Sequence, residues 1–506
     1  DVNCAGWRAD LLGHGARPPA TQTDLEALGA DVVAPGPASG AVAAPEHRVG
    51  GDPTTDPRRV DARTHRAALH VAGALRALRT PEGYASPARY RTHVAHYAAA
   101  LRARARGEPW DLTPGDFTDG RCPDFGAAAV EPFIDAPERV PFLARCAEIA
   151  GPVLREFEPD TVGISVIFRS QLLPAAALGG WVRRQRPGAV VMLGGGFLDA
   201  LPAGTRAMLE RRLGAVVLGD GEPALRAAFG LEPPEPDFFR DPDFGDFDLD
   251  AYLAPGRVLP IAASRGCYWR RCAFCDEGRR DFAQDRPRAF AARLARLAAA
   301  HAPACLHFTD NAVPPACLRL LADEGSPAAW FGFVRARPEL RDPGFVRALA
   351  ASGCRMLQLG LETPVPRLLA ALGKGVDPGD YGPILRNCAE AGIRSYVYLM
   401  FGLPGQTVAD CEAALRLIAS EPMDFLNASI FRLPPGAAMG ADPALWAIDR
   451  FEAERATSLY HAWSAPGMDT RAVRHWLARR LRREPRARAA LARTPSYFKS
   501  SHAAFL

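Results

Sequence analysis

The chain has 506 residues, of which 48% are hydrophobic and 23% charged, as in an ordinary globular protein with room for two or three domains. Its 61 basic and 57 acidic residues give a net charge of +4, so composition gives no case for a nucleic-acid or membrane partner. No run of about 18 uncharged apolar residues occurs, and eleven cysteines in this length are not a disulfide scaffold. We therefore expect a cytoplasmic protein whose thiols stay reduced.

The first 135 residues carry little information about function. Apolar spacing in residues 24–33 and 66–78 favours helices, and a Pro/Gly-rich turn at 35–40 lies between them. We expect a largely helical region here and predict no site in it.

A regular alternation of strands and helices begins next and extends over residues 136–235. The expected helices are 142–157, 172–184 and 204–213, and the expected strands are 161–167, 189–193 and 215–218. This alternation predicts a doubly wound, Rossmann-like parallel sheet with helices on both faces. Glycine-rich loops follow the second and third strands, at the edge where such sheets accept ligands.

A second alternating series follows a proline-rich, acidic linker at 236–255 and fills residues 256–440. The expected strands are 258–262, 305–309, 329–334, 355–361, 394–400 and 425–430, with helices at 290–299, 315–322, 343–351, 381–391 and 407–418. Six such units predict a partial (β/α)6, TIM-like barrel whose site lies at the carboxyl ends of its strands. Residues 441–506 read as a basic, helical C-terminal extension.

Three cysteines directly follow the first strand of this barrel. Cys267, Cys272 and Cys275 are spaced C-x4-C-x2-C. Three thiolates on one loop can hold three irons of a cubane cluster and leave the fourth iron open, whereas an electron-carrying cluster normally takes four cysteines. A zinc site would need a fourth ligand, and the next candidates stand singly in the sequence: Cys305, His307 and Cys317. A disulfide with a spare thiol is also disfavoured, because nothing indicates secretion.

This loop resembles that of the radical S-adenosylmethionine (radical SAM) enzymes. Their loop usually reads C-x3-C-x2-C with an aromatic residue before the last cysteine, here Phe274, and this sequence has one extra residue in the first spacing. The resemblance implies that Cys267, Cys272 and Cys275 bind a [4Fe–4S] cluster whose open iron is chelated by S-adenosylmethionine (SAM). It also implies reductive cleavage of SAM to a 5′-deoxyadenosyl radical, with reduced flavodoxin or ferredoxin as the electron donor.

Polar residues at successive strand ends match the same family. The resemblance implies SAM contacts from Phe274, Asp310, Arg335, Arg337 and Glu362. A guanidinium of either arginine suits the methionine carboxylate, and Glu362 would accept hydrogen bonds from the ribose hydroxyls or the methionine ammonium. Two further stretches resemble the family, residues 368–375 and 401–407. For any one of these charged residues alone, a solvated surface pair is the ordinary alternative.

The doubly wound segment resembles the second part of the cobalamin-binding domain that precedes the barrel in one radical SAM subgroup. The residues implied to edge the cobalamin are Ser165, Gly194, Gly195, Gly196, Gly219, Gly221 and Glu222. Glycine turns in such sheets also occur without any cofactor.

The function expected from these features is cobalamin-dependent methylation of an unactivated carbon in a natural product or peptide. The same radical could instead serve a cobalamin-independent cyclisation, rearrangement or cross-linking. An alternative of another class is a non-catalytic iron–sulfur or zinc protein. The sequence names neither the substrate nor a catalytic residue.

Overall fold

The computed structural model describes residues 67, 69–231, 239–245, 247–279, 281–434, 436–452 and 462–493. The helix expected at 24–33 lies outside the described residues. Contacts divide the chain into two compact units. Residues up to Arg121, with Asp250–Pro255, belong to the first, and Cys122–Leu249 and Gly256–Thr494 belong to the second. This division does not separate the domains expected from the sequence, so their boundaries stay predictions.

The first unit combines helices with one small hairpin. Its elements are a helical stretch at 69–77, the 3₁₀ helix η1 (Pro81–Tyr84), α4 (Pro87–Arg104), β1 (Trp110–Leu112) and β2 (Phe117–Asp119). Ser86 caps α4 by accepting a hydrogen bond from the Arg89 N–H. Tyr84 donates its hydroxyl hydrogen bond to the Leu253 carbonyl at 3.0 Å, which ties the 250–255 segment to this unit. The sequence did not predict the hairpin.

The second unit begins with a three-stranded parallel sheet in the order β3-β4-β5. Its elements are α5 (Ala127–Asp135), α6 (Leu143–Phe157), β3 (Thr161–Ser165), α7 (Leu172–Gln185), β4 (Val190–Gly194), α8 (Ala203–Leu213), β5 (Gly214–Val216) and α9 (Gly221–Ala228). The α/β alternation expected here is confirmed.

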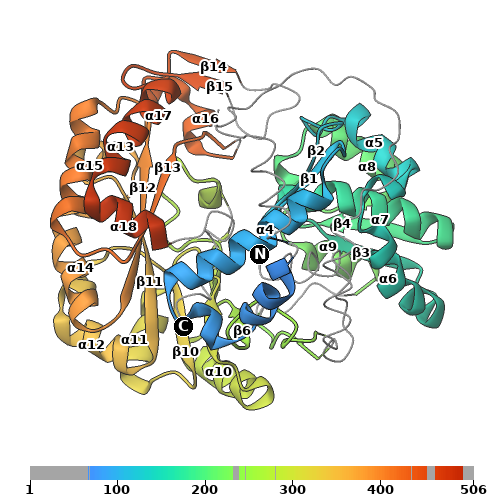
Figure 1. Cartoon of the computed structure of the whole chain (residues 1–506), viewed down its shortest axis with the longest axis horizontal. Helices are drawn as coiled ribbons and strands as arrows, with labels where there is room; N and C mark the ends of the chain where they lie inside the picture. The colour runs from blue at the N-terminus through green and yellow to red at the C-terminus, as the bar shows by residue number, and fades with distance from the viewer. Residues whose placement is uncertain are drawn as a thin grey trace. The chain divides into compact units, whose positions relative to one another are not determined.

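The second large sheet of this unit has six parallel strands in the order β13-β12-β11-β10-β9-β6 (Figure 1). The strands are β6 (Val258–Ile261), β9 (Cys305–Phe308), β10 (Ala329–Val334), β11 (Cys354–Glu362), β12 (Arg394–Phe401) and β13 (Phe425–Ile430). The helices between them are α10 (Pro287–His301), α11 (Pro315–Glu324), α12 (Pro343–Ala351), α13 (Pro366–Ala371), α14 (Tyr381–Glu390) and α15 (Val408–Ser420). The expected partial barrel is confirmed.

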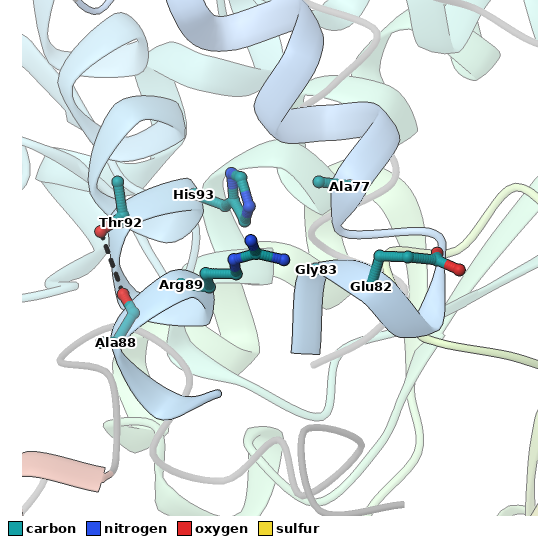
Figure 2. A pocket seen from close by; sticks show the side chains of 7 residues that line it. All are labelled: Ala77, Glu82, Gly83, Ala88, Arg89, Thr92 and His93. Atoms are coloured by element: carbon teal, nitrogen blue, oxygen red, sulfur yellow. Dashed lines mark hydrogen bonds between the residues drawn. The ribbon is translucent and has the colours of Figure 1, made fainter. Parts of the chain in front are cut away.

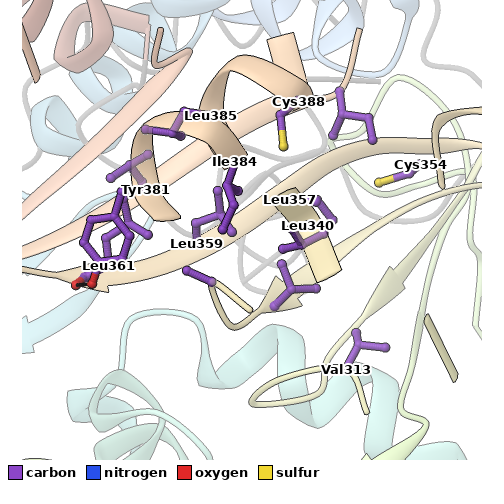
Figure 3. Packing of buried hydrophobic residues seen from close by; sticks show 14 of the residues in the cluster. Val313, Leu340, Cys354, Leu357, Leu359, Leu361, Tyr381, Ile384, Leu385 and Cys388 are labelled. Carbon is purple, nitrogen blue, oxygen red and sulfur yellow. Dashed lines mark hydrogen bonds between the residues drawn. The ribbon is translucent and has the colours of Figure 1, made fainter. Parts of the chain in front are cut away.

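Alternate residues of each barrel strand face the helices, because side chains alternate across a strand. In β11 these are Leu357, Leu359 and Leu361, all fully buried in one core that also contains residues of α14 (Figure 3). Each fully buried leucine contributes about 1.5–3 kcal/mol to the stability of this core. The other face of the sheet carries aromatic rings, such as Phe333 and Tyr398, whose centroids lie 5.1 Å apart.

The two edges of the barrel sheet are covered differently. Strand β6 is short and contains Pro260, whereas β13 is contacted by two C-terminal helices, α17 (Thr470–Arg479) and α18 (Pro485–Arg493). Arg493 of α18 donates a hydrogen bond to the Asp424 carbonyl, just before β13, at 2.8 Å. The extension also contains α16 (Ala438–Ala441) and a hairpin of β14 (Arg450–Glu452) and β15 (Ala462–Ser464). No helix in the described ranges has the length and apolar character needed to span a membrane.

Candidate functional site

The cysteine loop leaves the barrel sheet beside the first strand and lies between two short strands, β7 (Ser264–Arg265) and β8 (Ala283–Gln284). Asp310, just after β9, accepts hydrogen bonds from the Ala263 N–H at 3.0 Å and from the Ser264 hydroxyl. Asp310 is buried, and desolvation raises the pKa of its carboxyl group. This aspartate therefore fixes the backbone that leads into the loop.

The three thiols on this loop are half-buried and free of disulfides. Burial raises the pKa of Cys272 and raises that of Cys275 to about 12, while the positive charges of Lys374 and Arg335 act to lower the pKa of Cys272. As they stand, no three His, Cys, Asp or Glu side chains among the described residues are grouped closely enough to hold a metal ion. The donor set nevertheless suits an iron–sulfur cluster: three free cysteines on one loop, one of them beside two cations.

A tight turn at Gly373–Gly375, after α13, packs directly on the cysteine loop. The Trp269 indole N–H donates to the Gly373 carbonyl at 2.7 Å, and the Ala273 N–H donates to the Leu372 carbonyl at 2.9 Å. Gly375 has φ +61°, and a Cβ there would lie only 1.9 Å from the Trp269 ring. The turn therefore requires glycine at this position for both conformation and space.

Arg335 follows β10 and is buried against the same loop. Its guanidinium carbon lies 4.2 Å from the centroid of the Trp269 ring, and its Nη2 donates to the Lys374 carbonyl. Its Nη1 lies 4.0 Å from the Cys272 sulfur. The structure thus places this predicted SAM contact against a cluster cysteine.

Glu362, the last residue of β11, forms an ion pair with Lys374. The Nζ–Oε1 distance is 2.7 Å, and the two side chains are only 9–10% exposed. Glu362 has φ +61° at a bulge in the strand, and a Cβ on Gly360 would lie 2.7 Å from its carboxylate. The Lys374 ammonium also lies 5.7 Å from the Phe274 ring centroid. Glu362, Lys374 and Phe274 therefore form one group beside the cysteine loop.

Arg337, the other arginine expected to contact SAM, has a different local partner. It donates two hydrogen bonds to the Glu339 carboxylate, at 2.6 and 3.1 Å. This pairing raises the pKa of Arg337 and lowers that of Glu339. Its role toward SAM stays a prediction.

The sequence did not identify Lys374 or Trp269 as site residues. Lys374 belongs to a stretch noted for its resemblance, but its pairing with Glu362 depends on how the turn folds back. One signal was available: the chain has two lysines, and this one stands between two glycines.

The glycine loops of the three-stranded sheet differ in what surrounds them. A Cβ added to Gly194, Gly219 or Gly221 would meet no atom within 4 Å, so space is open there. Gly195 has φ +109° and lies against the backbone of Val166, which a Cβ would approach to 2.6 Å. Ser165 and Gly196 are exposed at the same strand ends. Among Gly194, Gly195, Gly219 and Gly221, packing thus requires glycine at Gly195 alone.

Large apolar side chains are exposed at this edge of the sheet. Ile167, Phe168 and Leu218 follow β3 and β5 and are 41–56% exposed. Glu222, at the start of α9, forms a hydrogen-bonded ion pair with Arg265 of β7. An exposed apolar edge with open glycine loops suits a large ligand with an apolar face.

The first unit contains a separate open hollow of about 500 Å³. Figure 2 shows its lining side chains, which come from the 69–77 helix, η1 and α4: Ala77, Glu82, Gly83, Ala88, Arg89, Thr92 and His93. Desolvation lowers the pKa of His93. None of the residues expected to bind a cofactor lines this hollow.

Comparison with known proteins identifies the barrel. The model of the radical SAM superfamily matches residues 261–418, from the end of β6 through most of α15. The chain contains a radical SAM domain. The cysteine loop and the Glu362–Lys374 pair both lie within the matched range.

Two solved radical SAM structures share the fold over a longer range than this domain. TsrM of Kitasatospora setae, a radical SAM methyltransferase solved with tryptophan substrate and a SAM analogue, is 20% identical with a TM-score of 0.51. The match covers 65% of this chain and 79% of TsrM. OxsB, a cobalamin-dependent SAM radical enzyme solved with aqua-cobalamin and SAM, is 13% identical with a TM-score of 0.51. That match covers 62% of this chain and 57% of OxsB.

A curated relative also matches this chain in sequence. The uncharacterized methyltransferase PH0819 of Pyrococcus horikoshii is 22% identical over 322 residues, which are 56% of this chain and 69% of PH0819. These likenesses support an α/β architecture in which a parallel sheet precedes the radical SAM barrel.

Proposed function

We propose that this radical SAM enzyme methylates an unactivated carbon of a small molecule or peptide, with cobalamin as the methyl carrier. The observation that carries the proposal is a loop of three free thiols beside a buried Glu–Lys pair in the matched radical SAM domain. A second α/β sheet with an open, apolar ligand edge precedes that domain.

Cys267, Cys272 and Cys275 would hold the [4Fe–4S] cluster. When bound, the cluster supplies the electron that cleaves SAM into methionine and a 5′-deoxyadenosyl radical. Lys374 and Arg335 stabilise the thiolate form of Cys272 by their positive charges. The Glu362 carboxylate, held in place by Lys374, would accept hydrogen bonds from the SAM ammonium or ribose.

The strand ends of the three-stranded sheet would hold cobalamin. When bound, cobalamin supplies the methyl group that the substrate carbon receives. Ile167, Phe168 and Leu218 offer apolar contact, and the open space at Gly194 and Gly219 admits a bulky ligand. OxsB was solved with aqua-cobalamin, and TsrM and PH0819 are named methyltransferases, which supports this assignment.

Cobalamin-independent radical chemistry is the second candidate, and two observations favour it. Gly195 is needed for packing against Val166, and Glu222 pairs with Arg265, so both have structural roles that require no cofactor. In this case the radical would serve cyclisation, rearrangement or cross-linking. Reduced flavodoxin or ferredoxin is the electron donor that we propose for either reaction.

Anaerobic reconstitution in the presence of hydroxocobalamin, followed by gel filtration, tests the proposal. Iron, sulfide and corrinoid are then measured in the same sample, and SAM turnover is followed as 5′-deoxyadenosine and S-adenosylhomocysteine. We expect about four irons per chain on the three cysteines, with one corrinoid retained. Zinc in place of iron would refute radical chemistry.

Two surface variants separate cobalamin binding from unspecific adsorption. Leu218→Glu places a charge at the carboxyl edge of the three-stranded sheet and should reduce the retained corrinoid. Phe157→Glu is the matched control, since Phe157 is an exposed apolar residue at the end of α6, before β3 begins. Four irons without corrinoid, or equal retention in both variants, would favour the cobalamin-independent reaction.

A further inference from the structure

The cysteine loop contains a backbone conformation that other contacts must hold. Arg270, within the longer first spacing, has φ +54°, a left-handed conformation that is unfavourable for a residue other than glycine. The residue before it, Trp269, is anchored by its indole hydrogen bond to Gly373 and by close contact with Gly375. The extra residue of the loop is therefore accommodated where Trp269 meets the Gly373–Gly375 turn.

Two guanidinium groups lie over the Trp269 ring. The Arg335 carbon is 4.2 Å and the Arg271 carbon 5.3 Å from the ring centroid. A cation is attracted to a tryptophan ring most strongly where water is excluded, and Arg335 is only 7% exposed. Trp269 thus joins β10, the turn and the cysteine loop.

The charge of Arg335 needs a counter-charge. A buried guanidinium is unfavourable unless an anion lies close to it. In the part of the chain that the structure describes, no carboxylate lies within ion-pair distance of Arg335; the Glu362 carboxylate pairs with Lys374, and the Lys374 carbonyl accepts the Arg335 hydrogen bond. The Cys272 sulfur, 4.0 Å from Nη1, is an ionisable group beside it.

We propose that Arg335 and Trp269 form a clamp that fits the C-x4-C-x2-C loop to its cluster. Arg335 is a positioning residue and a fixed positive charge beside Cys272, and it does not bind the SAM carboxylate. The inference rests on the proposed function, because the charge matters only if the cysteines hold a cluster. A positive charge beside a cluster ligand stabilises the reduced cluster, so Arg335 raises its reduction potential.

The test compares reconstituted wild type with Arg335→Met, Arg335→Lys, Trp269→Phe and Arg386→Gln. Arg386 is a matched control, since it is an exposed arginine of α14 paired with Glu421. The readouts are iron per chain after gel filtration, the cluster midpoint potential from an EPR-monitored redox titration, and the SAM dissociation constant from equilibrium dialysis. Circular dichroism verifies that each variant is folded.

We expect R335M to shift the midpoint potential to more negative values while its SAM dissociation constant stays within about threefold of wild type. R335K keeps the charge and should keep most of the potential. W269F removes the hydrogen bond to Gly373 and should retain less iron, with the wild-type potential in the loaded fraction. R386Q should match wild type in all three readouts. Loss of iron by R335M but not by R335K also supports the charge role.

Two results would overturn the clamp. One is R335M with wild-type iron and potential. The other is an R335M variant whose SAM affinity falls more than about tenfold while its potential is unchanged. That result would mean that Arg335 binds the SAM carboxylate. If R335M does not fold, W269F decides: wild-type iron retention by W269F would overturn the clamp. If the wild type retains no iron after reconstitution, the proposed function itself is refuted. This outcome differs from failure of the clamp, because every variant then lacks iron as well.

Discussion

Replacing Gly375 with alanine should disturb the cysteine loop through a single methyl group. The new Cβ would lie 1.9 Å from Cζ2 of Trp269, so the ring must move by about 1.5 Å to reach ordinary van der Waals distance. A movement of that size breaks the 2.7 Å hydrogen bond from Trp269 to Gly373. We expect a cost of about 1–2 kcal/mol for φ +61° on alanine and about 1–3 kcal/mol for the steric overlap.

Gly392→Ala provides the control that separates these two terms. Gly392 follows α14 and has φ +75°, but a Cβ there would meet no atom within 4 Å, so only the conformational cost applies. Urea unfolding of the iron-free protein and iron retention after reconstitution are measured for both variants. G375A should unfold at lower urea than G392A and lose iron, while G392A keeps it. Equal midpoints and equal iron would refute the role that the structure gives to the Trp269 contact.

Two further predictions concern buried charge. Lys374→Met leaves the Glu362 carboxylate buried without its 2.7 Å partner and should destabilise the protein by about 3–5 kcal/mol, whereas Arg386→Met, at an exposed pair, should cost below about 1 kcal/mol. Equal shifts in urea unfolding would contradict this. Desolvation lowers the pKa of His307 from 6.5 to about 4, so the fold keeps it neutral while the unfolded chain takes up a proton. Stability should therefore fall by up to about 3 kcal/mol as the pH drops from about 7 to 4. His307→Phe, which keeps a ring stacked on Phe331, should lose less stability over that range, and an identical pH dependence would exclude His307 as the cause.

Long, periodic elements were predictable from the sequence because their apolar alternation continues over a whole strand or helix. The expected bounds of β10, α12 and β13 match the structure residue for residue. The hairpin of β1 and β2 was missed, since three-residue strands are too short to show a period of two. The hairpin of the C-terminal extension was missed for the same reason.

The site was predictable only to the level of strand ends. Asp310 and Arg335 follow β9 and β10, and Glu362 is the last residue of β11, so all three lie at carboxyl ends of strands, as the barrel rule requires. The partners of Arg335 and Glu362 were not predictable, because Lys374 reaches both only when the Gly373–Gly375 turn folds back, and Trp269 contacts Arg335 from the cysteine loop. A guanidinium that suits a carboxylate also suits an aromatic ring, and spacing alone does not distinguish the two.

The open barrel sheet has two edges, and each has its own protection against pairing with another chain. In β6 the proline removes one backbone donor from a short strand, which makes that edge a poor template for strand addition. At β13 the protection comes from α17 and α18, which are the last described helices. Shortening the chain before Thr470 would therefore leave the six residues of β13 without this cover and favour aggregation, so a truncated chain should retain both helices.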